Sequence, residues 1–188
     1  MLRWVSDRLC RISNGWAALA SLIVFVLFTV LVLPRQAAKA DAQAPDAGSP
    51  DTSLWYTARE LYEMAEAYGE QGRAAYIRAR FTFDLIWPLV YGAFLTTALS
   101  WVYARAVEPD SPWRLANLAP LLSVLLDYLE NLSTSLVMLR YPGRTPVIDT
   151  LAPVLTLIKW LLVGGSFVLL LVGAGAGAWQ RIRGESKE

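Results

Sequence analysis

The chain of 188 residues contains no histidine and a single cysteine, Cys10. The lack of histidine removes the commonest general base and the commonest protein ligand of zinc and haem iron. A single cysteine excludes an internal disulfide, so any loop must be ordered by packing alone. No activated nucleophile and no metal or cofactor site is visible. We therefore expect no cofactor and favour a protein that is not an enzyme.

Charged residues are scarce as well, at 18% of the chain, against roughly a quarter in a soluble domain. The net charge is +1 and no basic stripe is present that would meet phosphates, which argues against a nucleic-acid partner. Hydrophobic residues make up 55% of the chain and are gathered in long blocks. The composition predicts an integral membrane protein, and the excess of arginine over lysine with abundant alanine favours a bacterial source.

Four apolar blocks are long enough to cross a bilayer as helices, which takes about 20 residues each. The predicted spans are 16–34, 83–104, 115–140 and 150–176. They are flanked by a cytoplasmic N-terminal segment (1–15), an extracytoplasmic loop (35–82) and a cytoplasmic tail (177–188). Pro34 is expected to end the first span, because proline cannot continue a regular helix. The predicted fold is an all-α integral membrane protein with an antiparallel four-helix transmembrane bundle.

The first block has two interpretations. Its apolar run from Trp16 to Leu33 is longer than the usual signal-peptide core of about 7–15 residues, which favours an uncleaved anchor. The small residues of "AKADA" at 38–42 would instead suit cleavage. Arginine and lysine near the span ends are evenly divided between the two sides. The arginines before the first block favour an inner-membrane location with both termini in the cytoplasm.

The first loop has two parts of different composition. Residues 35–50 are rich in alanine, proline and aspartate without any periodicity, which predicts a flexible linker. From about 51 to 68, apolar residues recur at helical spacing, with Asp51 as the expected N-cap. We therefore predict an extra amphipathic helix in this loop. It would either cap the outer end of the bundle or lie on the outer leaflet.

Several polar side chains stand inside the predicted spans, where each is costly unless it faces the protein interior and finds a partner. Those of the third span share one helical face at i, i+3, i+4 and i+7. With a rise of 1.5 Å per residue, Glu130, Lys159 and Tyr91 lie at similar depth. The candidate intramembrane site comprises Asp84, Tyr91, Asp127, Glu130, Asn131, Thr134 and Lys159, with Arg80 and Trp87 at its mouth.

Two pairings are expected within this set. Glu130 should face Lys159, which would leave Asp127 as the acid without a fixed cationic partner. Arg80 and Asp84, at i and i+4, should form a modest ion pair that borders water. The polar groups would either be structural, joining helices, or line a site that opens to the outer side, and the sequence leaves both interpretations open.

Three functions remain, beginning with a non-catalytic accessory or scaffold protein, or a small binding protein. Its partners would be the lipid bilayer and either another membrane protein or a second copy of the chain. The first alternative is a proton- or cation-coupled carrier subunit that uses a titrating carboxylate. The second is a lipid-modifying membrane enzyme with paired carboxylates as general acid and base.

Overall fold

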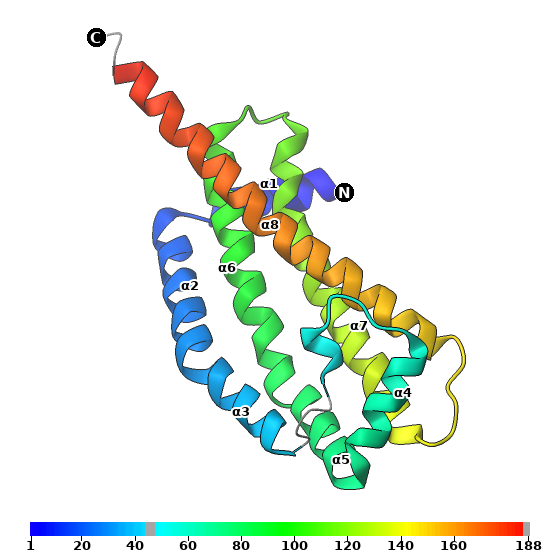
Figure 1. Ribbon diagram of the computed structural model, residues 1–188. Helices are drawn as coiled ribbons and strands as arrows, with labels where there is room; N and C mark the ends of the chain where they lie inside the picture. The colour runs from blue at the N-terminus through cyan, green and yellow to red at the C-terminus, as the bar shows by residue number, and fades with distance from the viewer. Residues whose placement is uncertain (44–47, 186–188) are drawn as a thin grey trace. The chain divides into compact units, whose positions relative to one another are not determined.

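The computed structural model describes residues 1–43 and 48–185, and every regular element in those ranges is a helix (Figure 1). In chain order they are α1 (Leu2–Ile12), α2 (Gly15–Leu27), η1 (Phe28–Val32), α3 (Leu33–Gln43), η2 (Pro50–Thr52), α4 (Ala58–Ala67), α5 (Gly69–Arg80), α6 (Phe83–Ala106), η3 (Pro112–Leu118), α7 (Ala119–Arg140) and α8 (Ile148–Glu185). The element η1 is a π-helix, whereas η2 and η3 are 3₁₀-helices. The predicted all-α class is confirmed.

Within the described residues, four helical stretches are long and apolar enough to cross a membrane. They are Gly15–Ala42, Gly69–Ala106, Pro112–Arg140 and Ile148–Gly177. This finding indicates a multi-pass membrane protein. The predicted C-terminal tail, 177–188, is helical as far as Glu185, and its last three residues lie outside the described ranges.

The chain divides into two compact units. Unit 1 consists of Met1–Phe25, Val90–Leu122 and Leu162–Glu188, and unit 2 consists of Val26–Leu89 and Ser123–Leu161. Each of the four apolar stretches contributes one segment to each unit.

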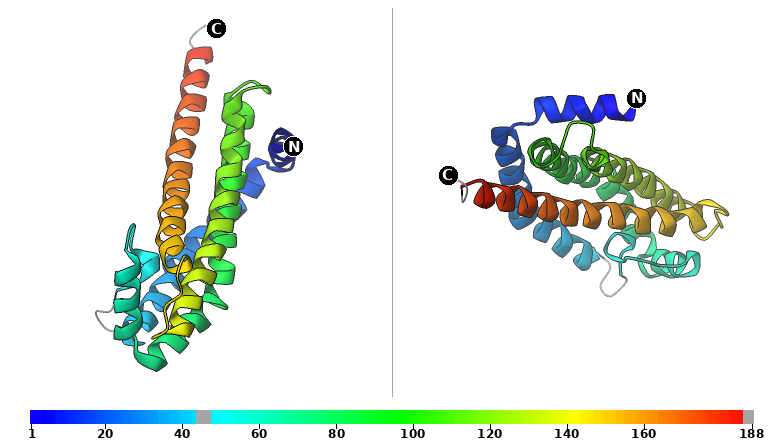
Figure 2. Two further views of the ribbon diagram at one scale, coloured as in Figure 1. Left: turned by 90° about the vertical axis from the view of Figure 1, so that its right-hand side faces the viewer. Right: turned by 90° about the horizontal axis from the view of Figure 1, so that it is seen from above.

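Unit 1 is organised around Asn117 of η3, whose side chain is fully buried. Its amide donates to the carbonyl of Ser6 at 3.2 Å and to the hydroxyl of Ser100 at 2.9 Å. The Ser6 hydroxyl donates in turn to the carbonyl of Arg114 at 3.0 Å. Helix α1 is therefore held against η3, and it lies across the connection between α6 and α7 (Figure 2).

Close helix packing completes unit 1. The ring of Phe25 stacks on Phe94 with centroids 5.0 Å apart and meets Phe167 at 6.0 Å. A Cβ added at Gly173 would come within 2.8 Å of the Tyr103 side chain, so glycine permits α8 to approach α6 there. The Tyr103 hydroxyl donates to the carbonyl of Leu169 at 2.9 Å across the same contact.

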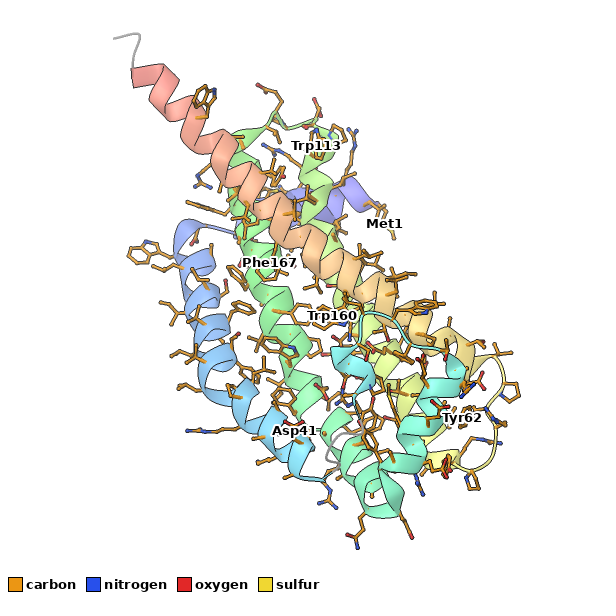
Figure 3. All side chains as sticks on the ribbon, in the orientation of Figure 1. Met1, Asp41, Tyr62, Trp113, Trp160 and Phe167 are labelled. Carbon is orange, nitrogen blue, oxygen red and sulfur yellow. The ribbon has the colours of Figure 1, made fainter. Side chains whose placement is uncertain are left out.

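Unit 2 has a core in which the first loop packs on α7 and α8. The buried members are Tyr56, Leu61, Tyr62, Ala65, Tyr76, Val137, Met138 and Ala152. The hydroxyl of Tyr62 donates to Asp149 at 3.3 Å and accepts from the backbone N–H of Thr145 at 2.7 Å. Tyr62 thus joins α4 to the start of α8, beside the connection from α7 (Figure 3).

The first membrane-crossing stretch, formed by α2, η1 and α3, continues through Pro34, so the prediction that it ends there is wrong. The predicted flexible linker is helical as far as Gln43, and residues 44–47 of it lie outside the described ranges. The π-helix η1 precedes the proline, and the N–H of Leu33 bonds to the carbonyl of Phe28, five residues earlier. This wider turn accommodates a residue that has no N–H and whose ring would otherwise press on the carbonyl of Val30.

The helix predicted from about Asp51 begins instead at Ala58. Thr57 and Glu60 form a capping box: the Thr57 hydroxyl accepts from the Glu60 N–H at 3.2 Å, and the Glu60 carboxylate accepts from the Thr57 N–H at 2.7 Å. At the other end, Gly69 has a φ of +60°, which ends α4 and turns the chain into α5. Asp51 lies in the 3₁₀-helix η2 and pairs with Arg80 instead of capping α4.

Candidate functional site

Helix α7 supplies one continuous polar face to unit 2. Asp127, Glu130, Asn131 and Thr134 are all buried on it. Helix α8 contributes Thr156 and Lys159, which are also buried and lie three residues apart. The helical repeat of 3.6 residues explains why these spacings gather the polar groups on the facing sides of the two helices.

Lys159 is the cation between the two acids of α7. Its ammonium forms an ion pair with Glu130 and lies 3.7 Å from the carboxylate of Asp127. The predicted facing of Glu130 and Lys159 is confirmed, whereas the expectation that Asp127 lacks a cationic partner is wrong. Asp127 and Glu130 are one helical turn apart on one face, so a single long lysine side chain reaches both.

A second contact joins Glu130 to the first loop. The Thr156 hydroxyl donates to Glu130 Oε1 at 2.6 Å and lies 3.1 Å from the hydroxyl of Tyr56. Burial raises the pKa of the Tyr56 phenol above its usual value, so it stays neutral and retains its proton. With the single Thr156 proton directed to Glu130, Tyr56 is the donor to Thr156, and the chain of bonds runs from the loop into the cluster.

Arg80 of α5 is the second cation of this polar cluster. It forms ion pairs with Asp51 and, at 3.1 Å, with Asp84, and it donates to the side-chain oxygen of Asn131 at 3.5 Å. The amide of Asn131 donates to Asp127 at 3.0 Å, which links Arg80 to Lys159 and its two carboxylates. The connected side chains are called the network below: Asp51, Tyr56, Arg80, Asp84, Asp127, Glu130, Asn131, Thr156 and Lys159.

The predicted Arg80–Asp84 pair is present, but it is largely buried and is shared with Asp51, and only Arg80 lines a surface hollow. The Arg80 and Asp84 side chains are only 12% and 9% exposed. Asp51 reaches Arg80 because the first loop, itself part of unit 2, folds back over the helices of that unit. The backbone carbonyl of Asp51 also accepts from the indole N–H of Trp160 at 3.2 Å (Figure 3).

The other predicted site residues are Thr134, Trp87 and Tyr91. The Thr134 hydroxyl donates to carbonyls of its own helix, those of Glu130 and Asn131. Trp87 stacks on Phe28 with centroids 5.5 Å apart. Tyr91 is buried and belongs to unit 1.

Three members of the network were not predicted as site residues from the sequence: Asp51, Tyr56 and Thr156. Thr156 had a usable signal, because it lies one turn before Lys159 on the same helical face. Asp51 and Tyr56 had none, since they come from a loop whose path follows no periodic pattern.

The network carries more acid than base. Its charged members are the carboxylates of Asp51, Asp84, Asp127 and Glu130 and the cations of Arg80 and Lys159. Within the described part of the chain, no group of three or more side chains of the metal-binding types is arranged to hold a metal ion. The arrangement therefore offers ion pairing and proton binding.

A surface hollow of about 210 Å³ touches one edge of the network. It is lined by Arg80, Phe81, Leu85, Tyr128, Asn131 and Leu132. Glu130 and Lys159 do not line it and are 0% and 4% exposed. At the centre of the network, Glu130 is thus fully covered by protein and Lys159 almost fully.

Comparison with known proteins adds no assignment to this geometry. No family model matches the chain, and no curated protein or solved structure is significantly similar to it.

Proposed function

We propose that this chain is a non-catalytic accessory or scaffold protein of a membrane, and that its buried ionic network serves to hold the first loop on the helices. One observation carries the proposal: Glu130 and Lys159 are paired with each other and enclosed by protein. A transport or catalytic group must meet its substrate, whereas a structural group need not. Breaking such a pair is strongly destabilising, so the network also explains why a loop without disulfides packs in one way.

The finer topology is part of the same proposal. Four spans in an antiparallel bundle would place the first loop outside an inner membrane and both termini in the cytoplasm. Helix α4 would be the amphipathic helix of that loop, since Leu61, Tyr62 and Ala65 are buried whereas Glu63 and Glu66 are exposed. The contact of Ser21 with Thr97 at 2.8 Å supports an anchor that stays with the bundle after insertion.

A photocrosslinking experiment in native membranes tests the scaffold. Leu54 and Trp55 of the first loop are 67% and 56% exposed and are apolar, which suits a contact with another protein. A photoreactive amino acid at either position should yield one protein adduct of constant mass. The same residue at the fully buried Leu61 serves as the control. Crosslinking to lipid alone, or no adduct at either position, contradicts a scaffold that uses this loop.

A proton-coupled carrier is the second candidate, and the surplus of carboxylates over cations favours it. An acid without its own cation is the usual proton-binding group of membrane transporters. The chain of hydroxyls from Tyr56 through Thr156 to Glu130 offers a route for a proton. Opening of the first loop would be required, because that loop covers the network.

A flux measurement separates the two candidates. The full-length protein, reconstituted in vesicles loaded with a pH-sensitive dye, should pass no more protons under an imposed gradient than protein-free vesicles. Proton flux that Glu130→Gln abolishes and Glu66→Gln leaves intact would establish the carrier and overturn the scaffold. Glu66 is the control because it is exposed on α4 and forms no part of the network.

A further inference from the structure

Helix α1 presents two different stripes on the surface that it does not bury against η3. Its buried side is centred on Ser6, with Val5, Leu9 and Cys10 partly covered. One exposed stripe consists of Trp4, Arg8 and Ile12, and the other of Arg3, Asp7 and Arg11. In each stripe the residues follow at i, i+4 and i+8, so the apolar and the charged stripe run side by side along the helix.

The apolar stripe is large for so short a helix. Trp4 is 60% and Ile12 68% exposed. Arg8 lies between them with its guanidinium 5.3 Å from the centre of the Trp4 ring, so its stem covers apolar surface while its charge stays outside. The charged groups of the helix are three arginines and one aspartate, a net positive set.

The position of α1 in the chain restricts what can cover this surface. Only Ser13 and Asn14 separate α1 from Gly15, where the first membrane-crossing stretch begins. The bonds of Asn117 and Arg114 to Ser6 hold α1 against η3, and η3 itself opens the third such stretch. Because α1 is attached at both places to the ends of such stretches, we expect it to lie at the level of the lipid headgroups.

We propose that α1 is an interfacial helix that binds anionic phospholipid headgroups through Arg3, Arg8 and Arg11. The stripe of Trp4 and Ile12 enters the boundary between headgroups and acyl chains, where indole rings are favoured. The arginines then meet lipid phosphates as bidentate donors, and a negative leaflet surface adds attraction for each. Charge complementarity together with exposed apolar residues favours a lipid surface over an acidic protein, which would not need the apolar stripe.

A lipid titration tests the arginines. The melting temperature of the full-length protein in a neutral detergent is followed as phosphatidylglycerol is added, with phosphatidylcholine in a parallel series. Phosphatidylglycerol should raise the melting temperature. The triple variant Arg3→Gln, Arg8→Gln, Arg11→Gln should need roughly a hundredfold more of it, since each of the three arginines near an anionic surface is worth roughly fivefold in affinity.

A charge-matched variant supplies the control. Arg59→Gln, Arg78→Gln and Arg140→Gln remove three exposed arginines of unit 2 and should leave the titration midpoint unchanged. A triple α1 variant that titrates like the wild type overturns the proposal, and so does a control variant that shifts by the same factor.

Spin labels report the position of the helix independently of affinity. In a Cys10→Ser background, labels at Ile12→Cys and at Asp7→Cys are compared in vesicles of phosphatidylcholine and phosphatidylglycerol. The Ile12 label should be relaxed more by oxygen, which partitions into lipid, and the Asp7 label more by a water-soluble nickel chelate. Equal access of the chelate to both labels would mean that α1 faces water or a protein, and the lipid proposal would fail.

Discussion

At the residue scale, we expect the stability of unit 2 to depend on Lys159, because one ammonium is shared by two buried carboxylates. Lys159→Met should lower the free energy of unfolding by about 3–5 kcal/mol, the usual cost of removing one partner of a buried ion pair. Removing the charge of Asp127 and Glu130 as well, by Asp127→Asn and Glu130→Gln, should restore most of the loss. Unfolding of the full-length protein in detergent measures both effects.

The control for this comparison is Lys39→Met, because Lys39 is exposed on α3. It should unfold like the wild type. If Lys159→Met also unfolds like the wild type, the ion pairs make no net contribution and the structural role assigned to the network is wrong.

At the element scale, the start of α4 depends on its capping box. Thr57→Ala should destabilise unit 2 by about 1 kcal/mol, because the first-turn N–H of Glu60 loses its acceptor. The local loss should appear as faster hydrogen exchange of the Leu61 amide, which bonds to the carbonyl of Thr57. The core helices α7 and α8 should keep their protection, and a uniform rise in exchange would argue against a local cap.

The same cap should respond to acid. The N–H and the hydroxyl of Thr57 both donate to the Glu60 carboxylate, which lowers its pKa below the ordinary value. A folded-state pKa below the unfolded one gives a contribution that is present above the unfolded value and lost as pH falls through the folded value. The protection factor of the Leu61 amide, which compares its exchange rate with the intrinsic rate at the same pH, should therefore fall in acid. Glu60→Gln should remove that pH dependence, whereas Glu66→Gln should retain it.

The π-helical form of η1 should depend on Pro34. Pro34→Ala supplies an N–H that can bond to the carbonyl of Val30, four residues earlier, and removes the ring that prevented this bond. The turn Phe28–Val32 should then revert to a regular α-helix, with Leu33 bonded to Thr29 instead of Phe28. Amide–carbonyl couplings measured by NMR would show the change of partner, and an unchanged Leu33–Phe28 bond would mean that packing, not proline, sets the π-helix.

At the scale of the whole molecule, the proposed topology predicts where single cysteines react. In a Cys10→Ser background, Leu54→Cys should be labelled by an impermeant reagent from outside, and Asp110→Cys only after the membrane is opened. Both positions are exposed, and the second apolar stretch lies between them. Labelling of both from one side would contradict four spans, and the reverse pattern would invert the orientation.

The amino-acid sequence by itself determined the class of the protein and the centre of the network. Apolar blocks of sufficient length predict membrane helices, because a bilayer leaves few other ways to satisfy the backbone. The constant rise and rotation of a helix place Asp127 and Glu130 on one face and bring Glu130 level with Lys159. The i, i+4 spacing of Arg80 and Asp84 predicted their pair for the same reason, and the structure contains it.

Tertiary structure alone decided which residues of the first loop join the network and pair with its members. Asp51 and Tyr56 contact Arg80 and Thr156 only because the first loop folds back over unit 2, and a loop path has no period that a sequence could display. The helix through Pro34 likewise depends on one wide turn, which the spacing of side chains does not encode. Local helical geometry repeats along the chain and is therefore readable, whereas contacts between distant segments depend on the packing of the whole fold.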